Sequence, residues 1–272
     1  MEGMRFLPNR TFTPGNAPIP MSRTLPEQGF NKHERLGRGR DGVWGREGET
    51  FLKVSPSLPQ APRTTMTTTR SPLPAIVLAA GFSRRMGRCK LTLTLDGEPL
   101  VRRAVRAALD AGLAPVLVTV RPDASPELLE AVSGFDARVE IVPAPDAHLG
   151  QAESLKAGIR RLVSRFDCPP PGVVVLLGDQ PLVGAELVRE LTAFYLQKPE
   201  CAAAPACDGV RGNPVILPAG AFGDTLLLSG DKGARGILAA FGLRLMPTND
   251  TAAITDVDTW EAYESLSRAK PL

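Results

Sequence analysis

A cluster of basic residues and glycines follows the first apolar run of the sequence. Residues 78–90 read LAAGFSRRMGRCK and come directly after the apolar residues 75–77. Glycines let the backbone approach a ligand closely and turn its N–H groups toward it, as in anion-binding nests. The pattern matches neither the dinucleotide fingerprint GxGxxG nor the Walker A motif. It therefore predicts either a phosphate-binding loop of another kind or a solvated basic loop. Its cationic side chains are Arg84, Arg85, Arg88 and Lys90.

Acidic residues that suit a magnesium ion occur in two other places. Asp179 ends the apolar run VVVLLGD, and Asp256 and Asp258 lie in the segment TDVDT. Magnesium at phosphate-transferring sites is held by one or two carboxylates together with the phosphates of the substrate. An aspartate at a strand end that meets the basic loop would serve as such a ligand. The alternatives are structural: Asp179 as a turn or cap residue, and Asp258 as the cap of the following helix.

Strand-like and helix-like segments alternate from residue 74 onward and decide where these side chains must lie. The apolar runs are continuous, as expected for strands covered on both faces, and the segments between them have helical spacing. Past residue 200 the pattern loosens into two short helices and a final helix over WEAYESLSRA. This order predicts an α/β fold, a three-layer sandwich on a mostly parallel sheet, with ligands bound beyond the carboxyl ends of the strands. We expect strands at 75–80, 115–120, 138–144 and 172–179, and helices at 99–112, 125–134, 150–166 and 185–197.

Five short motifs resemble the signatures of the MobA-like nucleotidyltransferases. LAAGFSRRMGRCK is similar to the family pattern LAxGxSxRMGxxK, and GDQP (178–181) is similar to GDxP. RGNPVIL (211–217), SGDKGAR (229–235) and TDVDTWEAY (255–263) resemble three further motifs, in the family's order. The resemblance covers residues 74–266. It implies a Rossmann-like α/β/α sandwich of the nucleotide-diphospho-sugar transferase type, and an enzyme that moves a nucleotide from a nucleoside triphosphate to an acceptor.

The resemblance also implies roles for the residues that match. Arg85, Lys90 and Asp179 would be catalytic, because they meet the charge that develops on the departing pyrophosphate. The ligands of Mg²⁺ would be Asp179, Asp258 and Asp256, with Asp258 preferred over Asp256. The nucleotide would be bound by Leu78, Ala79, Ala80, Gly81, Ser83, Arg85, Met86, Gly87 and Lys90. The acceptor would be bound by Gly150, Ser154, Asn213, Asp231 and Arg235.

Ala80 favours one nucleotide over another. Guanylyltransferases of the family resemble LAGG at this point, whereas LAAG resembles the molybdenum cofactor cytidylyltransferases. The methyl group narrows the base site and favours a pyrimidine, although one methyl discriminates by only about 1–3 kcal/mol. We therefore expect Mg²⁺-dependent transfer of CMP from CTP to the terminal phosphate of molybdopterin. Two alternatives stay open: a transferase of the same fold that uses GTP or a different phosphorylated acceptor, and a non-catalytic carrier that delivers molybdopterin to its apoenzyme.

Composition narrows the remaining possibilities. The chain of 272 residues has four scattered cysteines and two histidines, which argues against a disulfide framework, a zinc site and histidine-based chemistry. No apolar run is long enough for a membrane span and no secretory signal is evident, so we expect a cytoplasmic protein. We expect a monomer whose partners are the nucleotide, molybdopterin, and a molybdoenzyme or its insertion chaperone, with no nucleic acid.

The first 70 residues differ in character from the rest. They are rich in Pro, Gly, Arg and Thr, and hold 11 Lys or Arg against 6 Asp or Glu, a charge of +5. The remaining residues hold 21 against 23, a charge of −2, which gives no reason to expect nucleic-acid binding. We expect residues 1–70 to be disordered or to precede a true start at Met66, the alternative being a basic tail that binds an acidic partner. Residues 71–272 are expected to form a single MobA-like nucleotidyltransferase domain.

Overall fold

Four parallel strands form one half of the main sheet. The computed structural model describes residues 72–83, 85–228 and 235–268. The four strands pair in the order β5-β4-β1-β6, and β1, β4 and β6 are buried along almost their whole length. Strands buried in this way need helices on both faces of the sheet. Their bounds are β1 (Ala75–Leu78), β4 (Val116–Val120), β5 (Val139–Pro143) and β6 (Gly172–Leu177).

The sheet continues beyond β6 with strands of mixed direction. β9 pairs antiparallel with both β6 and β7, whereas β10 runs parallel to β7, which also forms a short hairpin with β8. The order along the sheet is therefore β10-β7-β9-β6-β1-β4-β5. A separate hairpin pairs β2 with β3. These strands are β2 (Thr94–Leu95), β3 (Glu98–Pro99), β7 (Ala203–Cys207), β8 (Val210–Arg211), β9 (Val215–Pro218) and β10 (Arg244–Pro247).

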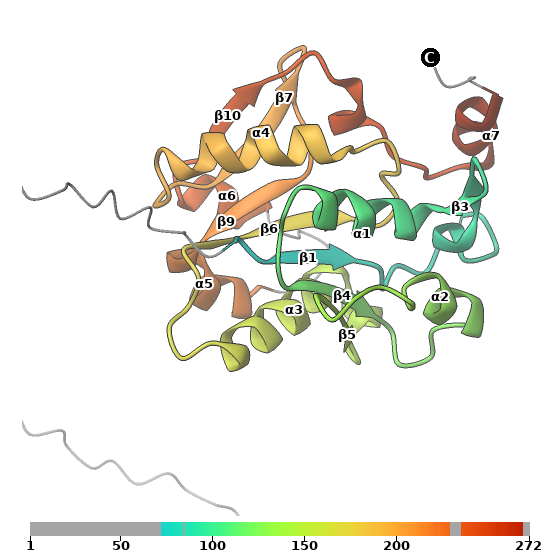
Figure 1. Ribbon diagram of the computed structural model, residues 1–272, viewed down its shortest axis with the longest axis horizontal. Helices are drawn as coiled ribbons and strands as arrows, with labels where there is room; N and C mark the ends of the chain where they lie inside the picture. The colour runs from blue at the N-terminus through green and yellow to red at the C-terminus, as the bar shows by residue number, and fades with distance from the viewer. Residues whose placement is uncertain (1–71, 84, 229–234, 269–272) are drawn as a thin grey trace, which may run out of the picture. The chain divides into compact units, whose positions relative to one another are not determined.

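Helices cover both faces of this sheet (Figure 1). One apolar cluster joins the sheet to α1 (Leu100–Asp110), α2 (Pro126–Ala131) and α4 (Ala185–Leu196). A second cluster, on the other face, joins it to α3 (Gln151–Arg165), α5 (Phe222–Leu226) and α6 (Arg235–Ala240). The last helix is α7 (Trp260–Arg268), whose Tyr263 packs with a third cluster near the β2–β3 hairpin.

Strand β1 shows how its residues are divided between the two faces. Val77 packs into the cluster of α1 and α4, and its neighbour Ile76 packs into the cluster of α3. This alternation is the two-residue period of a strand. Gly158 of α3 lies so close to β1 that a Cβ atom there would be 2.8 Å from Ile76 Cγ2. The missing side chain therefore lets α3 lie directly on the sheet.

The order of the strands creates a crevice next to β1. The chain passes from β1 to β4 and β5 on one side and then returns to β6 on the other side of β1. In open α/β sheets, ligands bind at such a switch point, beyond the carboxyl ends of the strands. The Gly178 N–H donates to Leu78 O at 3.0 Å, so β1 and β6 stay together up to their ends. The loop after β1 and the turn after β6 therefore meet at this crevice.

The predicted fold class and the alternation of elements are confirmed. Each of the eight strands and helices expected before residue 200 is present, with ends that differ by at most three residues. The two short helices and the final helix expected after residue 200 correspond to α5, α6 and α7. The strands after residue 200 (β7, β8, β9 and β10) and the small β2–β3 hairpin were not predicted. None of the described helices is both long and apolar enough to cross a membrane. The expectations for residues 1–70 fall outside the described residues, and the single domain over 71–272 stays a prediction.

Candidate active site

Lys90 lies between two aspartates from distant parts of the chain. Its Nζ atom is 2.6 Å from Asp179 Oδ2 and 2.6 Å from Asp258 Oδ1. Arg85 Nη1 is 3.2 Å from the other carboxylate oxygen of Asp258. These residues come from the loop after β1, the turn after β6 and the segment before α7. The structure thus brings together four of the residues that the sequence singled out for catalysis and metal binding.

The loop after β1 is closed by its own backbone and by Ser83. The Lys90 N–H donates to Ser83 Oγ at 3.0 Å, and the Met86 N–H donates to Ser83 O at 3.0 Å. Gly87 has a φ of 67°, in the left-handed region that glycine adopts without strain. Met86 is only 5% exposed and packs in the third apolar cluster, beside Val257. The Met86 side chain therefore anchors the loop, whereas Arg85 and Arg88 are exposed.

Asp258 is positioned through its neighbour in the chain. The Val257 N–H donates to Asp179 O at 3.0 Å, and the Val257 side chain is fully buried. This backbone hydrogen bond ties the segment before α7 to the turn after β6. Asp256, the other candidate of this segment, is exposed and forms no ion pair with a described residue. The geometry favours Asp258 over Asp256 as the partner of Asp179.

The charges of this cluster stabilise one another. Burial alone would lower the pKa of Lys90, but the ion pairs with Asp179 and Asp258 outweigh it and raise that pKa. The hydrogen bond from Lys90 lowers the pKa of Asp258, and the charge of Arg85 adds to this effect. Partial desolvation, followed by the charges of Asp258 and Asp179, raises the pKa of Asp256. These shifts in pKa favour the cationic form of Lys90 and the ionised form of Asp258.

The two carboxylates fit a magnesium site that is completed by a substrate. Both lie 2.6 Å from the same Lys90 Nζ, so the two contacting oxygens are at most twice that distance apart. Among the described residues there is no group of three or more His, Cys, Asp or Glu side chains that would hold a metal by itself. Magnesium commonly uses one or two carboxylates plus the phosphates of the substrate. The positions of Asp179 and Asp258 are compatible with this kind of site.

Two adjoining hollows open beside this cluster. The first, of about 300 Å³, is called the Ala80 cavity, after the alanine that lines it between β1 and the start of α3. The second, of about 490 Å³, is lined by Arg85, Lys90, Asp179 and Asp258, and shares six residues with the first. The Ala80 cavity is lined by Leu78, Ala80, Gly81, Phe82, Ser83, Lys90, Leu91, Ala147, His148, Leu149, Gly150, Gln151, Ser154, Leu177 and Asp179.

The expected acceptor-binding residues lie in different parts of the structure. Gly150, which caps α3 with a φ of 132°, and Ser154, which is 4% exposed, line the Ala80 cavity together with the expected nucleotide-binding residues. Asn213 lies just before β9; because Val215 pairs with Val175, this segment lies at the carboxyl end of β6. Two candidates cannot be placed: Asp231 is outside the described residues, and Arg235 begins α6 with a side chain that is not described.

Some predicted nucleotide-binding residues do not line either hollow, and other residues do so unexpectedly. Ala79 is 1% exposed and packs into the core on the α1 side, and Met86 packs into the third cluster. Gly87 is exposed and shapes the loop. The cavity residues that the sequence gave no reason to choose include Phe82, Leu149 and Gln151. In the sequence these residues lie next to Gly81 or Gly150, and this position is the feature that could have identified them.

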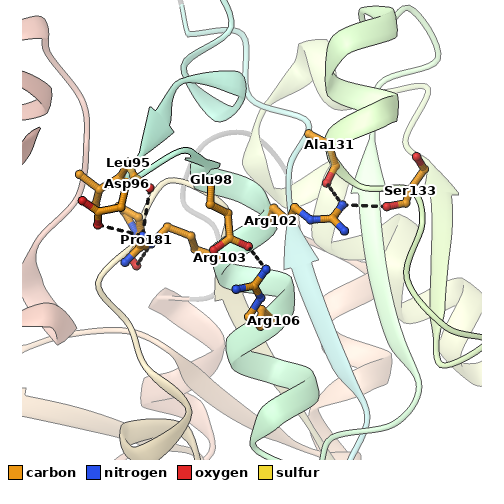
Figure 2. Close-up of polar contacts among 9 residues, drawn as sticks. All are labelled: Leu95, Asp96, Glu98, Arg102, Arg103, Arg106, Ala131, Ser133 and Pro181. Carbon is orange, nitrogen blue, oxygen red and sulfur yellow. Dashed lines mark hydrogen bonds and ion pairs between the residues drawn. The ribbon is translucent and has the colours of Figure 1, made fainter.

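Arg103 of α1 joins the turn after β6 to the β2–β3 hairpin (Figure 2). Its Nε donates to Pro181 O at 3.2 Å, and its Nη1 donates to Leu95 O at 3.1 Å and reaches Asp96 at 3.3 Å. Pro181 follows Asp179 by two residues in the GDQP motif. The guanidinium therefore supports the turn that carries a candidate metal ligand.

Replacing Arg103 by methionine is expected to lower the free energy of unfolding by about 1–2 kcal/mol, because two backbone carbonyls lose a charged donor. The unfolding midpoint in a thermal melt should fall by a few degrees. Arg268→Met is the matched control on α7, since Arg268 is exposed and pairs only with Glu264, one turn away, among the described residues. Its loss should cost less than about 0.5 kcal/mol. Equal effects of the two substitutions would contradict a supporting role for Arg103.

The comparison with known proteins agrees with this geometry. A family model described as the MobA-like NTP transferase domain matches residues 75–246. The purine catabolism protein PucB of Bacillus subtilis (strain 168) is 34% identical over 208 residues, covering 74% of this chain and 98% of PucB. A probable molybdenum cofactor guanylyltransferase of Opitutus terrae is 28% identical, covering 64% of this chain and 82% of that protein.

Two solved structures extend the comparison. The crystal structure of a Mycobacterium tuberculosis Rv0371c homologue from Mycobacterium sp. strain JC1 is 32% identical, with a TM-score of 0.62, covering 73% of this chain and 96% of its own. Rv0371c from Mycobacterium tuberculosis, solved in complex with manganese, shares the fold at 22% identity and a TM-score of 0.58, covering 74% of this chain and all of its own. The chain belongs to the MobA-like NTP transferase family, a family of nucleotidyltransferases.

Proposed function

We propose that the protein transfers CMP from CTP to the terminal phosphate of molybdopterin and releases pyrophosphate. The observation that carries the proposal is the contact of Lys90 with both Asp179 and Asp258, at the mouth of a cavity lined by Ala80. A cation between two carboxylates, next to a cavity of nucleobase size, suits a metal-bound triphosphate. A protein that only carried molybdopterin would need no such pair of carboxylates.

The nucleotide has a natural place in this arrangement. We place its base and sugar in the Ala80 cavity and its phosphates in the adjoining hollow, beside Arg85 and Lys90. In this placement Gly150 and Ser154 contact the nucleotide, although the sequence motif suggested the acceptor for them. The N-terminus of α3, which begins at Gln151, adds a favourable field for a nearby anion. The acceptor then approaches from the side of Asn213, at the carboxyl end of β6.

The transfer needs no general base. A phosphate oxygen of the acceptor is already anionic at neutral pH; it attacks the α-phosphorus while the bond to the pyrophosphate oxygen breaks. Lys90 and Arg85 donate to phosphate oxygens and balance the negative charge that pyrophosphate gains. Asp179 and Asp258 would hold Mg²⁺, which supplies further neutralisation of that charge when bound. The manganese complex of Rv0371c supports a divalent cation in this fold.

Product analysis tests the proposal directly. The full chain is incubated with Mg²⁺, isolated molybdenum cofactor and each of the four nucleoside triphosphates in turn, and pyrophosphate and the cofactor product are measured. The expected result is a dinucleotide product that contains CMP, and pyrophosphate release only when both substrates are present. A protein that bound molybdopterin without turnover would exclude the enzymatic proposal. Cytoplasmic location and a monomeric state remain predictions.

A guanylyltransferase is the second candidate. The similarity to a probable molybdenum cofactor guanylyltransferase favours it, although that relative is 28% identical. The structure places Ala80 in the wall of the cavity, where it is 4% exposed. A methyl group at this position takes space from the base. This location supports CTP, whereas the relative supports GTP.

Replacing Ala80 by glycine is expected to let GTP compete better with CTP. Because only one methyl group is removed, the ratio of the two kcat/KM values should change by about tenfold, or somewhat more. Competition between the two nucleotides with molybdopterin as the acceptor measures this ratio. If the unmodified protein prefers GTP, the cytidylyl proposal is wrong and the guanylyl candidate replaces it.

A further inference from the structure

A third hollow adjoins the Ala80 cavity on the side of β4. It has a volume of about 340 Å³ and shares Phe82, Ala147 and His148 with that cavity. A base that fills the Ala80 cavity therefore presents one edge to this hollow. Its other walls come from the residues after β4 and β5: Arg121, Pro122, Asp123 and Pro145.

The register of the sheet places Arg121 beside Ala80. Leu78 of β1 is paired with Thr119 of β4, and the Ala79 N–H donates to Thr119 O at 2.9 Å. Ala80 and Arg121 each follow these paired residues by two positions. The side chain of Arg121 therefore starts next to Ala80, at the end of the neighbouring strand β4.

The guanidinium of Arg121 lies over the ring of Phe82. The Cζ atom of Arg121 lies 4.1 Å from the centre of the Phe82 ring, and the side chain is 21% exposed. Its Nε is 3.5 Å from Asp123 Oδ1, which is too long for a good hydrogen bond. No described residue accepts a hydrogen bond from its terminal nitrogens. The planar guanidinium of Arg121 is thus oriented before a ligand binds, and its terminal N–H donors are available to a ligand in the hollow.

We propose that Arg121 is a specificity-determining residue that recognises the edge of the nucleobase. The inference rests on the nucleotide binding in the proposed function and deepens it. The two terminal N–H groups of a guanidinium suit two hydrogen-bond acceptors that lie next to each other. The Arg121 fork would pair with such an edge on a base in the Ala80 cavity.

This chemistry separates the four bases into two pairs. Cytosine has adjacent acceptors at N3 and O2, and guanine has them at O6 and N7. In uracil a donor, N3–H, separates the two carbonyl oxygens, and in adenine each acceptor near the amino group adjoins a donor. Arg121 would therefore favour cytosine and guanine over uracil and adenine. Ala80 would then decide between cytosine and guanine by size.

Equilibrium binding without the acceptor tests this assignment. CTP, UTP, GTP, ATP and ribose 5-triphosphate are titrated, with Mg²⁺, into the full chain and into its Arg121→Met variant. The unmodified protein should bind CTP about 10–100-fold more tightly than UTP. Arg121→Met should lose most of this difference by weakening CTP, while UTP and ribose 5-triphosphate keep their affinities within about threefold. Arg121→Lys, which keeps the charge but lacks the fork, should also lose the difference.

Arg244→Met is the matched control. Arg244 also lies 4.1 Å from a phenylalanine ring, that of Phe194, but on β10 at the far edge of the sheet. This variant should keep the preference for CTP. The inference is overturned if Arg121→Met keeps the CTP preference, or if CTP and ribose 5-triphosphate weaken equally, which would assign Arg121 to phosphate. If the unmodified chain binds no nucleoside triphosphate, the proposed function itself fails.

Discussion

Replacing Lys90 by methionine is expected to lower kcat/KM for nucleotidyl transfer by about 10³-fold. The Nζ atom is the one cation in contact with both Asp179 and Asp258 among the described residues, and its side chain is only 12% exposed. A buried cation at this point can stay in contact with the phosphate oxygens while negative charge develops on the departing pyrophosphate. Methionine keeps the length and burial of the side chain and removes only its charge. Pyrophosphate release under saturating metal measures the loss.

Arg88→Met provides the control within the same loop. Arg88 is exposed, and its guanidinium carbon lies 5.9 Å from the Trp260 ring, away from both hollows. Its loss should change kcat/KM by no more than about threefold. If Arg88→Met were as damaging as Lys90→Met, general attraction of the triphosphate to a basic loop would explain both. A specific role for Lys90 would then be excluded.

Replacing Asp179 by asparagine is expected to lower kcat by about 10²–10³-fold and to raise the metal concentration needed for half-maximal activity. An amide keeps the shape of the carboxylate but carries no charge, so it binds a hard cation much more weakly. The loss should therefore be smallest at high Mg²⁺ concentration. A titration of activity against Mg²⁺, with Mn²⁺ as a second cation, gives both quantities.

Asp256→Asn is the corresponding control, because Asp256 is acidic and lies in the same region without contacting Lys90. It should retain activity within about tenfold. Thermal unfolding of each variant shows whether the fold is kept; Asp179 loses one partly exposed ion pair, which is worth a few degrees at most. Near-normal activity of Asp179→Asn at limiting Mg²⁺ would remove Asp179 from the metal site. A severe loss in Asp256→Asn would instead add Asp256 to it.

Local sequence was enough to predict the parallel half of the sheet, and not the rest. β1, β4 and β6 are buried on both faces, so their residues are continuously apolar, and each is followed by a segment with helical spacing. β9 is equally apolar, but its direction depends on pairing with β6, which lies some forty residues earlier. Apolar character carries no information about strand direction. The antiparallel position of β9 therefore could not be predicted.

Some residues of the candidate site could likewise be predicted from the sequence, and others could not. Lys90 and Asp179 could be predicted, because each lies in the segment that follows a recognisable strand, and the ends of parallel strands meet. Ala79 belongs to the same motif, but strand alternation turns it into the core, which a motif alone does not show. Arg121 was missed because a basic residue after a strand is common. Its position becomes informative only through the register that places it beside Ala80.

Because Asp258 lies late in the chain, the candidate site is completed only near the end of synthesis. Lys90 and Asp258 are separated by 168 residues, and the family match ends at residue 246. On the ribosome, every strand of the sheet is therefore synthesised before the second carboxylate appears. A nascent chain that has folded through β10 has its loop and Asp179 in place, but has no Asp258 beside Lys90. In the proposed mechanism, turnover would begin only after the final segment docks through Val257, so an incomplete translation product would be inactive even if it were well folded.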